Sequence, residues 1–278
     1  MIIDVHTHVY PEKIVKRAIE KLEKVSGVPA KTNGIKSGLV ASMREAGIDY
    51  SLLLPVATSV KQVDTINAEA AETNERAKET GLLSFGGIHT DTANYSEVLH
   101  QIKSCGLKGI KLHPDYQNTF FDDMRYKRIV EKATELGLYI MVHAGEDIGL
   151  PEPVHCRPEH VLSVLEETES DKLILAHMGG WRLWDEVEEL LAGQNIYFDT
   201  SFSLDCMPGI EGMLTEEQFL RLVRKHGADK ILFGSDSPWS SQKDYVDWMK
   251  RISLTEEERR LILGENARKI VELSGDML

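Results

Sequence analysis

The sequence predicts an α/β protein whose eight parallel strands and surrounding helices close into a single (β/α)8 TIM barrel. Eight short apolar runs, often rich in β-branched residues, occur along the 278 residues, and stretches with helical periodicity separate them. Continuous apolar runs are typical of parallel strands that are buried on both faces. A doubly wound open sheet is the alternative architecture.

The expected strands follow one another at intervals that fit a βα unit. They cover residues 2–6, 50–54, 82–88, 107–112, 138–143, 172–177, 196–199 and 230–233. The intervening segments carry apolar stripes at helical spacing, as Tyr245, Trp248, Met249 and Ile252 do. The first interval is longer and predicts an extra helix at 11–25, and residues 255–273 predict extra C-terminal helices. With no linker or repeat, residues 1–278 are expected to form one domain.

Composition limits the classes of partner. The formal net charge is −13, with 45 acidic against 32 basic residues and no basic stripe, so we expect no nucleic-acid partner. No apolar run approaches the length of a membrane span, and no signal peptide is recognised. Three widely spaced cysteines fit a reducing compartment. We therefore expect a cytoplasmic protein without a membrane association.

Histidines gather where the expected strands end. Ten occur in the sequence, and the carboxyl ends of TIM-barrel strands form the active-site face. The histidines at or just after strand ends are His6, His8, His89, His113, His143 and His177. By contrast, His100, His160 and His226 lie in helical stretches and are expected on the surface.

The spacing of these residues favours a metal site. Residues i and i+2 of a strand point to the same side, so His6 and His8 offer two imidazoles to one point. His143 and His177 each close an apolar strand, and Asp236 follows the eighth. In a closed barrel strand eight is adjacent to strand one, which would bring Asp236 to the first two histidines. Asp199, which ends strand seven, is a candidate to orient one of these ligands.

Six motifs in order along the chain resemble the amidohydrolase superfamily. They are DVHTH at 4–8, GIKLHP at 109–114, VHAGE at 142–146, LAHMGG at 175–180, FGSDSP at 233–238 and GENA at 264–267. The resemblance is to the family 2 branch, which includes predicted metal-dependent hydrolases and the aminocarboxymuconate-semialdehyde and resorcylate-type decarboxylases. It covers nearly the whole chain and is specific for fold and metal site rather than for substrate.

The resemblance implies a set of roles for the site residues. His6, His8, His143 and Asp236 would bind a divalent metal, most often zinc, and Asp236 and His177 would be the catalytic acid–base groups. One ion per chain is favoured. Two-metal relatives place a carboxylated lysine at the position of Lys111, so with two ions Lys111 and His177 would join the ligands. In the one-metal form, we expect Lys111, His113, Trp181 and Trp239 to contact the substrate.

These observations favour an enzyme that uses metal-activated water to hydrolyse a small organic molecule with an amide, ester or lactone-like carbonyl. The first alternative is nonoxidative decarboxylation of a small aromatic or unsaturated acid, which positive charge beside the metal would favour. The alternative of another class is a catalytically inactive binding protein, although every expected ligand is present. Related metal-dependent DNases carry a glutamate where this chain has KLHP. A homodimer is expected from the resemblance alone.

Overall fold

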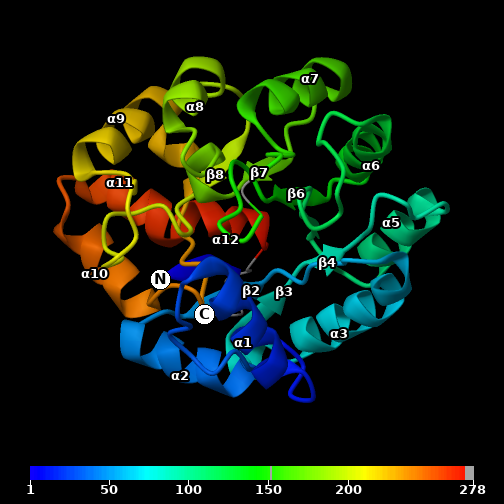
Figure 1. Cartoon of the computed structure of the whole chain (residues 1–278), viewed down its shortest axis with the longest axis horizontal. Coiled ribbons are helices and arrows are strands. Elements are labelled where there is room, and N and C mark those ends of the chain that lie inside the picture. Colours follow the sequence, from blue (N-terminus) through cyan, green and yellow to red (C-terminus); the bar gives the residue numbers. More distant parts are fainter. Residues whose placement is uncertain (151, 273–278) are drawn as a thin grey trace.

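In the computed structural model, which describes residues 1–150 and 152–272, helices surround a ring of parallel strands (Figure 1). The strands are β1 (Ile3–Thr7), β2 (Tyr50–Leu53), β3 (Leu82–Ser84), β4 (Gly86–Gly87), β5 (Gly109–Leu112), β6 (Tyr139–Val142), β7 (Leu173–Leu175), β8 (Tyr197–Asp199) and β9 (Ile231–Leu232). All eight expected strands are confirmed. The third is divided into β3 and β4 at Phe85, whose N–H still bonds to Leu53 of β2.

Helices follow the strands around the outside of the ring (Figure 1). They are α1 (Val15–Ser26), α2 (Lys36–Ala46), α3 (Val63–Glu75), α4 (Ala77–Thr80), α5 (Tyr95–Ser104), α6 (Met124–Glu135), α7 (Pro158–Thr168), α8 (Trp184–Leu190), α9 (Glu216–His226), α10 (Gln242–Arg251), α11 (Glu256–Arg260) and α12 (Asn266–Ile270). The extra helix after strand one is α1, and the extra C-terminal helices are α11 and α12, joined by a π-helical turn at Leu261–Glu265. Leu273, the last residue of that expected segment, lies outside the described residues. Among the residues described, no helix is both long enough and apolar enough to span a bilayer.

Strand pairing and backbone hydrogen bonds close the ring. Strands β1, β2 and β3 pair in parallel, and β4 to β9 pair in parallel in sequence order. Between the last strand and the first, the N–H of Val5 bonds to the carbonyl of Phe233 at 2.9 Å, and Thr7 forms a parallel bridge with Ser237. The doubly wound alternative is therefore wrong, and the fold is the expected (β/α)8 barrel.

The barrel interior is apolar at its amino-terminal end. Successive residues of a strand point to opposite faces, so each strand contributes alternate side chains to the inside. One buried cluster combines these inward residues with apolar side chains of the C-terminal segment: Ile3, Val5, Leu52, Leu54, Met141, Ile174, Ala176, Leu232, Ala267 and Ile270 are among its members. The C-terminal helix α12 thus packs against the barrel core, and the polar residues collect at the other end.

The Asp4 side chain forms hydrogen bonds across the seam, the line along which the first strand meets the last one and closes the barrel. Its buried carboxylate accepts hydrogen bonds from the Ser235 N–H at 2.9 Å, the Ser235 hydroxyl at 2.5 Å and the Gln242 amide at 2.7 Å. Burial raises the pKa of Asp4 to about 6 even though these hydrogen bonds favour the ionised form. The side chain therefore links β1 to the loop after β9 and to α10.

Replacing Asp4 with alanine should destabilise the protein by about 3 kcal/mol, because several buried donors would lose their acceptor. Asp49→Ala is the matched control, since within the described residues the exposed Asp49 side chain accepts one hydrogen bond, from the Ile2 N–H. That variant should lose less than about 1 kcal/mol. Urea unfolding followed by circular dichroism measures both values, and equal losses would contradict the role given to Asp4.

His226 corrects one expectation from the sequence, because it is buried rather than on the surface. Its ring stacks on Phe198 with centroids 3.9 Å apart, and the Gly193 N–H donates to its Nδ1 at 3.1 Å. Its Nε2–H donates to the carbonyl of Ile196 at 3.0 Å. Burial lowers the pKa of His226 to about 4, and protonation of Nδ1 would also remove the bond from Gly193.

The folded state therefore favours neutral His226, whereas the unfolded chain protonates near the ordinary histidine pKa of about 6.5. His226 should contribute its full stabilisation above pH 6.5 and lose up to about 3 kcal/mol of it as the pH falls toward 4. Gln can form both hydrogen bonds without titrating. The stability of wild type relative to His226→Gln, from urea unfolding at pH 7 and 4.5, should therefore decrease at the lower pH. A pH-independent difference would refute this assignment.

Candidate metal centre

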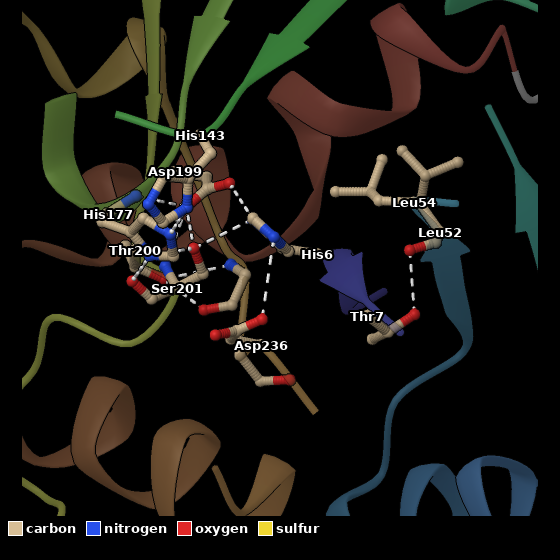
Figure 2. A network of polar contacts seen from close by, with 12 residues as sticks. His6, Thr7, Leu52, Leu54, His143, His177, Asp199, Thr200, Ser201 and Asp236 are labelled. Carbon is tan, nitrogen blue, oxygen red and sulfur yellow. Dashed lines mark hydrogen bonds and ion pairs between the residues drawn. The ribbon is translucent and has the colours of Figure 1, made fainter. Parts of the chain in front are cut away.

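The first and last strands bring His6, His8 and Asp236 together at the carboxyl end of the barrel. The Nε2 atoms of His6 and His8 lie 3.2 Å apart, and Asp236 Oδ1 lies 3.2 Å from His8 Nε2 and 3.7 Å from His6 Nε2. Figure 2 shows the His6 ring between Asp199 and Asp236. This confirms the expected convergence of strands one and eight on one point.

Hydrogen bonds to the other ring nitrogens fix both imidazoles. His6 Nδ1 lies 2.7 Å from Asp199 Oδ2, and His8 Nδ1 lies 2.9 Å from the carbonyl of Leu54. Carboxylate and carbonyl oxygens only accept, so each Nδ1 carries the proton and each Nε2 presents a lone pair. Two lone pairs that face each other repel, unless a cation or a proton lies between them.

Asp199 is the residue that orients His6. It also accepts hydrogen bonds from the N–H groups of His177 and Ser201 and from the Ser201 hydroxyl. Burial alone would raise the pKa of Asp199, but the interactions of its carboxylate with His6, His177 and Ser201 outweigh burial and hold this pKa well below its usual range. A carboxylate behind a histidine is the arrangement that raises the basicity of a metal ligand.

Asp236 is held in a strained position that points it at the two histidines. Its backbone has φ of 71°, a left-handed conformation that is uncommon for a non-glycine residue. Its N–H donates to the carbonyl of His6 at 2.8 Å, which ties the loop to β1. Burial would raise the pKa of Asp236, but its interactions with His8, His6 and His177 lower it overall. The carboxylate is therefore ionised at neutral pH.

These three atoms fit a divalent ion. Nitrogen and oxygen ligands lie about 2.0–2.2 Å from zinc, so two ligands of a tetrahedral site are about 3.3 Å apart. The observed separations of 3.2, 3.2 and 3.7 Å are close to that value. Two imidazoles whose Nε2 atoms are oriented by hydrogen bonds at Nδ1, together with one carboxylate, are a donor set that suits such an ion.

Lys111 places a buried cation beside this triad. Its Nζ lies 3.3 Å from His6 Nε2, and only 1% of the residue is exposed. Burial lowers the pKa of Lys111 to about 8, so the side chain is mostly protonated at pH 7 and donates to the His6 lone pair. This contact agrees with an unprotonated Nε2 of His6.

The other two predicted histidines, His177 and His143, contact each other beside the triad. His177 Nδ1 lies 2.9 Å from the carbonyl of Ser201, so it carries the proton and Nε2 is a lone pair. His143 Nδ1 lies 3.0 Å from that Nε2 and must donate to it. The structure thus gathers three of the four expected ligands, while His143 directs Nδ1 to His177 and Nε2 toward Asp115 and Asp147.

A second group of acidic residues surrounds the far side of His143, and sequence reasoning missed it. Asp147 and Asp115 each lie 3.9 Å from His143 Nε2, measured at Oδ2. The predicted substrate residue His113 stacks between His143 and Tyr116, with centroid distances of 4.1 and 4.0 Å. The signal was available, because Asp115 and Asp147 follow two of the strand-end histidines at short spacing.

The two predicted tryptophans lie in the loops around the site. Trp181 is buried under the Arg182 guanidinium, 4.2 Å from the ring centroid. Trp239 is partly buried and donates its backbone N–H to the carbonyl of Asp236 at 2.8 Å. Trp239 is therefore adjacent to the triad, whereas Trp181 packs in the wall of the barrel mouth.

Comparisons with known proteins agree with this geometry. The amidohydrolase family model matches residues 3–273, while no curated protein matches the chain in sequence. Among solved structures, a 2,6-dihydroxybenzoate decarboxylase from Rhizobium superposes with a TM-score of 0.69 at 17% identity, over 99% of both chains. A dihydroxybenzoic acid decarboxylase from Polaromonas with bound manganese and 2-nitroresorcinol gives 0.71 at 19%, over 100% of this chain and 98% of that one.

A third structure is a 5-carboxyvanillate decarboxylase from Novosphingobium aromaticivorans, complexed with manganese and 4-hydroxy-3-methoxy-5-nitrobenzoic acid. It gives a TM-score of 0.73 at 14% identity, over 98% of this chain and 96% of that chain. At these identities the likeness establishes the fold. Together with the family match and the His/Asp cluster, it supports a metal-dependent enzyme with a divalent ion.

Asp199→Asn should weaken metal binding by about 10- to 100-fold, the usual effect of losing a partner behind a ligand. The oxygen of the new Asn side chain would still accept hydrogen bonds from the N–H groups of His177 and Ser201. The NH2 group of the Asn would then face Nδ1 of His6. His6 would then take the tautomer whose Nε2 carries the proton and cannot ligate. Chelator competition with Zn²⁺ measures the affinity. Asp205→Asn in the exposed part of the same loop is the control, and equal affinities for both variants would contradict this role.

Proposed function

We propose that this chain, which belongs to the amidohydrolase family, is a metal-dependent hydrolase of a small organic molecule with an amide, ester or lactone-like carbonyl. The observation that carries the proposal is the convergence of the His6 and His8 lone pairs with the ionised Asp236 carboxylate. A divalent ion held there would lower the pKa of a water and polarise a carbonyl. We propose one ion per chain, and zinc as its identity.

The protein residues supply the proton chemistry and the orientation. Asp236 is ionised and its strained backbone points it at His6 and His8, so it can accept a proton from the attacking water. His177 is neutral because burial lowers its pKa. Its Nε2 accepts from His143 in this structure, so this lone pair can orient the water or assist the leaving group once His143 turns to ligate the ion. His143 is proposed as the fourth ligand by resemblance, although in this structure its Nδ1 donates to His177 and it is not among the residues that meet at the triad.

The substrate side of the site follows from the residues around the triad. Lys111, His113, Trp181 and Trp239 stay our predicted substrate contacts. Lys111 has the strongest support, since the His6 lone pair can serve only one partner. When an ion binds that lone pair, the Lys111 ammonium must leave it and is then free to bind an anionic group of the substrate.

Nonoxidative decarboxylation is the second candidate, and Lys111 is the observation that favours it. A substrate carboxylate would be attracted by a buried ammonium group beside the metal position. Lys111, with its pKa of about 8, could also deliver the proton that replaces carbon dioxide on the substrate carbon. The two candidates share the metal triad and differ in whether Asp236 accepts a proton or Lys111 donates one.

Three broader proposals accompany the reaction. Residues 1–278 act as one catalytic domain, because the motifs of the site are spread from β1 to the loop after β9. The protein works in the cytoplasm on a small molecule, without nucleic acid or membrane, as its charge and composition suggest. The homodimer rests on family resemblance and can be tested by light scattering.

Purified protein should contain about one divalent ion per chain by inductively coupled plasma mass spectrometry. His6→Ala should lose most of this metal, because it removes a ligand. His177→Ala should keep the metal and lose activity by about 100-fold or more. Loss of metal from His177→Ala would instead support the two-metal arrangement with Lys111.

A substrate panel separates the two reactions. In one set of assays the protein is incubated with esters, lactones and amides, and the release of acid is measured. In the other set it is incubated with carboxylated phenols, and the release of carbon dioxide is measured. Hydrolysis that disappears in Asp236→Asn supports the hydrolase, whereas carbon dioxide release that is lost in Lys111→Met supports the decarboxylase. A metal-loaded protein that turns over neither class would overturn both candidates.

A further inference from the structure

A stack of three rings leads away from His177 along the mouth of the barrel. His143, which contacts His177, lies face to face with His113, with ring centroids 4.1 Å apart and an interplanar angle of 7°. Tyr116 covers the other face of His113 at 4.0 Å and 5°. Among the described residues, no further aromatic ring packs on Tyr116. The Tyr116 ring is therefore the outer end of a stack that begins at the histidines of the site.

The stack is compatible with the proposed role of His143 as a metal ligand. An imidazole binds a metal ion through the lone pair of a ring nitrogen, and this lone pair lies in the plane of the ring. The contact with His113 occupies the face of the His143 ring instead. A substrate that is held at the ion can therefore extend along the stack toward Tyr116.

His113 itself is enclosed within this stack. It is buried, and its two faces are covered by His143 and Tyr116. Its Nδ1 accepts a hydrogen bond from the Tyr116 N–H at 3.4 Å, and its Nε2 lies 3.5 Å from Asp147 Oδ2. Tyr116 is only partly buried. A substrate that enters the mouth therefore reaches the Tyr116 ring before it reaches His113.

The Tyr116 hydroxyl is a polar group that the fold leaves available. It has no hydrogen-bond partner in the described part of the chain, and it is not among the buried polar atoms. Burial raises the pKa of this hydroxyl, and the nearby charges of Asp147 and Asp236 raise it further. The hydroxyl is therefore protonated at neutral pH and can donate a hydrogen bond close to both carboxylates.

We propose that Tyr116 determines specificity by donating a hydrogen bond to an uncharged acceptor, such as a hydroxyl or carbonyl oxygen, at the end of the substrate far from the ion. The carboxylates of Asp147 and Asp236 would repel a carboxylate of the substrate at this place, so the acceptor must be uncharged. The outer face of the Tyr116 ring would pack against an apolar part of the same substrate. The inference rests on the proposed function, since it takes the ion as the anchor of the substrate.

Hydroxamic acids test this role without knowledge of the substrate, because the two oxygens of a hydroxamate chelate a divalent ion. Zinc-loaded protein is titrated at pH 7 with benzohydroxamic acid and with 4-hydroxybenzohydroxamic acid, and calorimetry measures the affinities. The 4-hydroxyl is an uncharged acceptor at the end opposite to the hydroxamate. Wild type should bind the 4-hydroxy compound about 3- to 10-fold more tightly, as expected for one added hydrogen bond. It should bind 4-carboxybenzohydroxamic acid about 3-fold or more weakly than the parent compound.

Tyr116→Phe should lose the preference for the 4-hydroxy compound and keep its affinity for benzohydroxamic acid, because Phe preserves the stack on His113. Tyr139→Phe is the matched control and should keep the preference. Tyr139 is also partly buried, but it begins β6 at the opposite end of the barrel. Circular dichroism verifies that both variants are folded.

The outcomes separate this inference from the proposed function. A preference that persists in Tyr116→Phe, or that is absent from wild type, overturns the role of Tyr116 and leaves the metal site intact. Tighter binding of the 4-carboxy compound than of the parent overturns the requirement for an uncharged acceptor. A zinc-loaded wild type that binds no hydroxamate shows that the mouth does not admit a ligand along the stack, which also overturns the inference. A protein that takes up no zinc refutes the proposed function, and this inference with it.

Discussion

The seam between the first and last strands is the constraint on which the rest of the site depends. Asp4 binds Ser235 and Gln242 across that seam, and the Asp236 N–H bonds to the carbonyl of His6. These bonds join the first strand to the segment that follows the last strand, and they help to close the ring of βα units into a barrel. Only in the closed ring does a carboxylate that follows the last strand reach the imidazoles at the end of the first.

From the seam, one hydrogen-bond network runs across the mouth of the barrel. Both His6 and His177 place Nδ1 near Ser201, and Asp199 accepts from His6 and from the Ser201 hydroxyl. His177 in turn accepts from His143. When one ring nitrogen of a neutral imidazole carries the proton and donates it to a hydrogen bond, the other ring nitrogen must have a lone pair. The lone pairs at Nε2 of His6 and of His143 are consequences of the same set of bonds.

The site also concentrates backbone strain and buried charge. Asp236 and His177 have positive φ of 71° and 59° in loops that follow strands, as functional residues on rigid scaffolds often do. Burial lowers the pKa of Lys111 and of the histidines around it. A buried ammonium group attracts anions, and neutral imidazoles are good ligands for metal ions. The surrounding helices and the apolar end of the barrel provide the stability that such a site lacks.

The eight strands, the extra helices, and the meeting of His6, His8 and Asp236 could be predicted from the sequence, because they follow from local periodicity and from the parallel order of the strands. The direction in which His143 turns, its approach to Asp115 and Asp147, and the burial of His226 could be learned only from the folded structure. Strand alternation fixes the face on which a side chain lies, but its rotamer and tautomer depend on neighbours from other loops. Those neighbours are distant in sequence, and their convergence exists only after the barrel has closed.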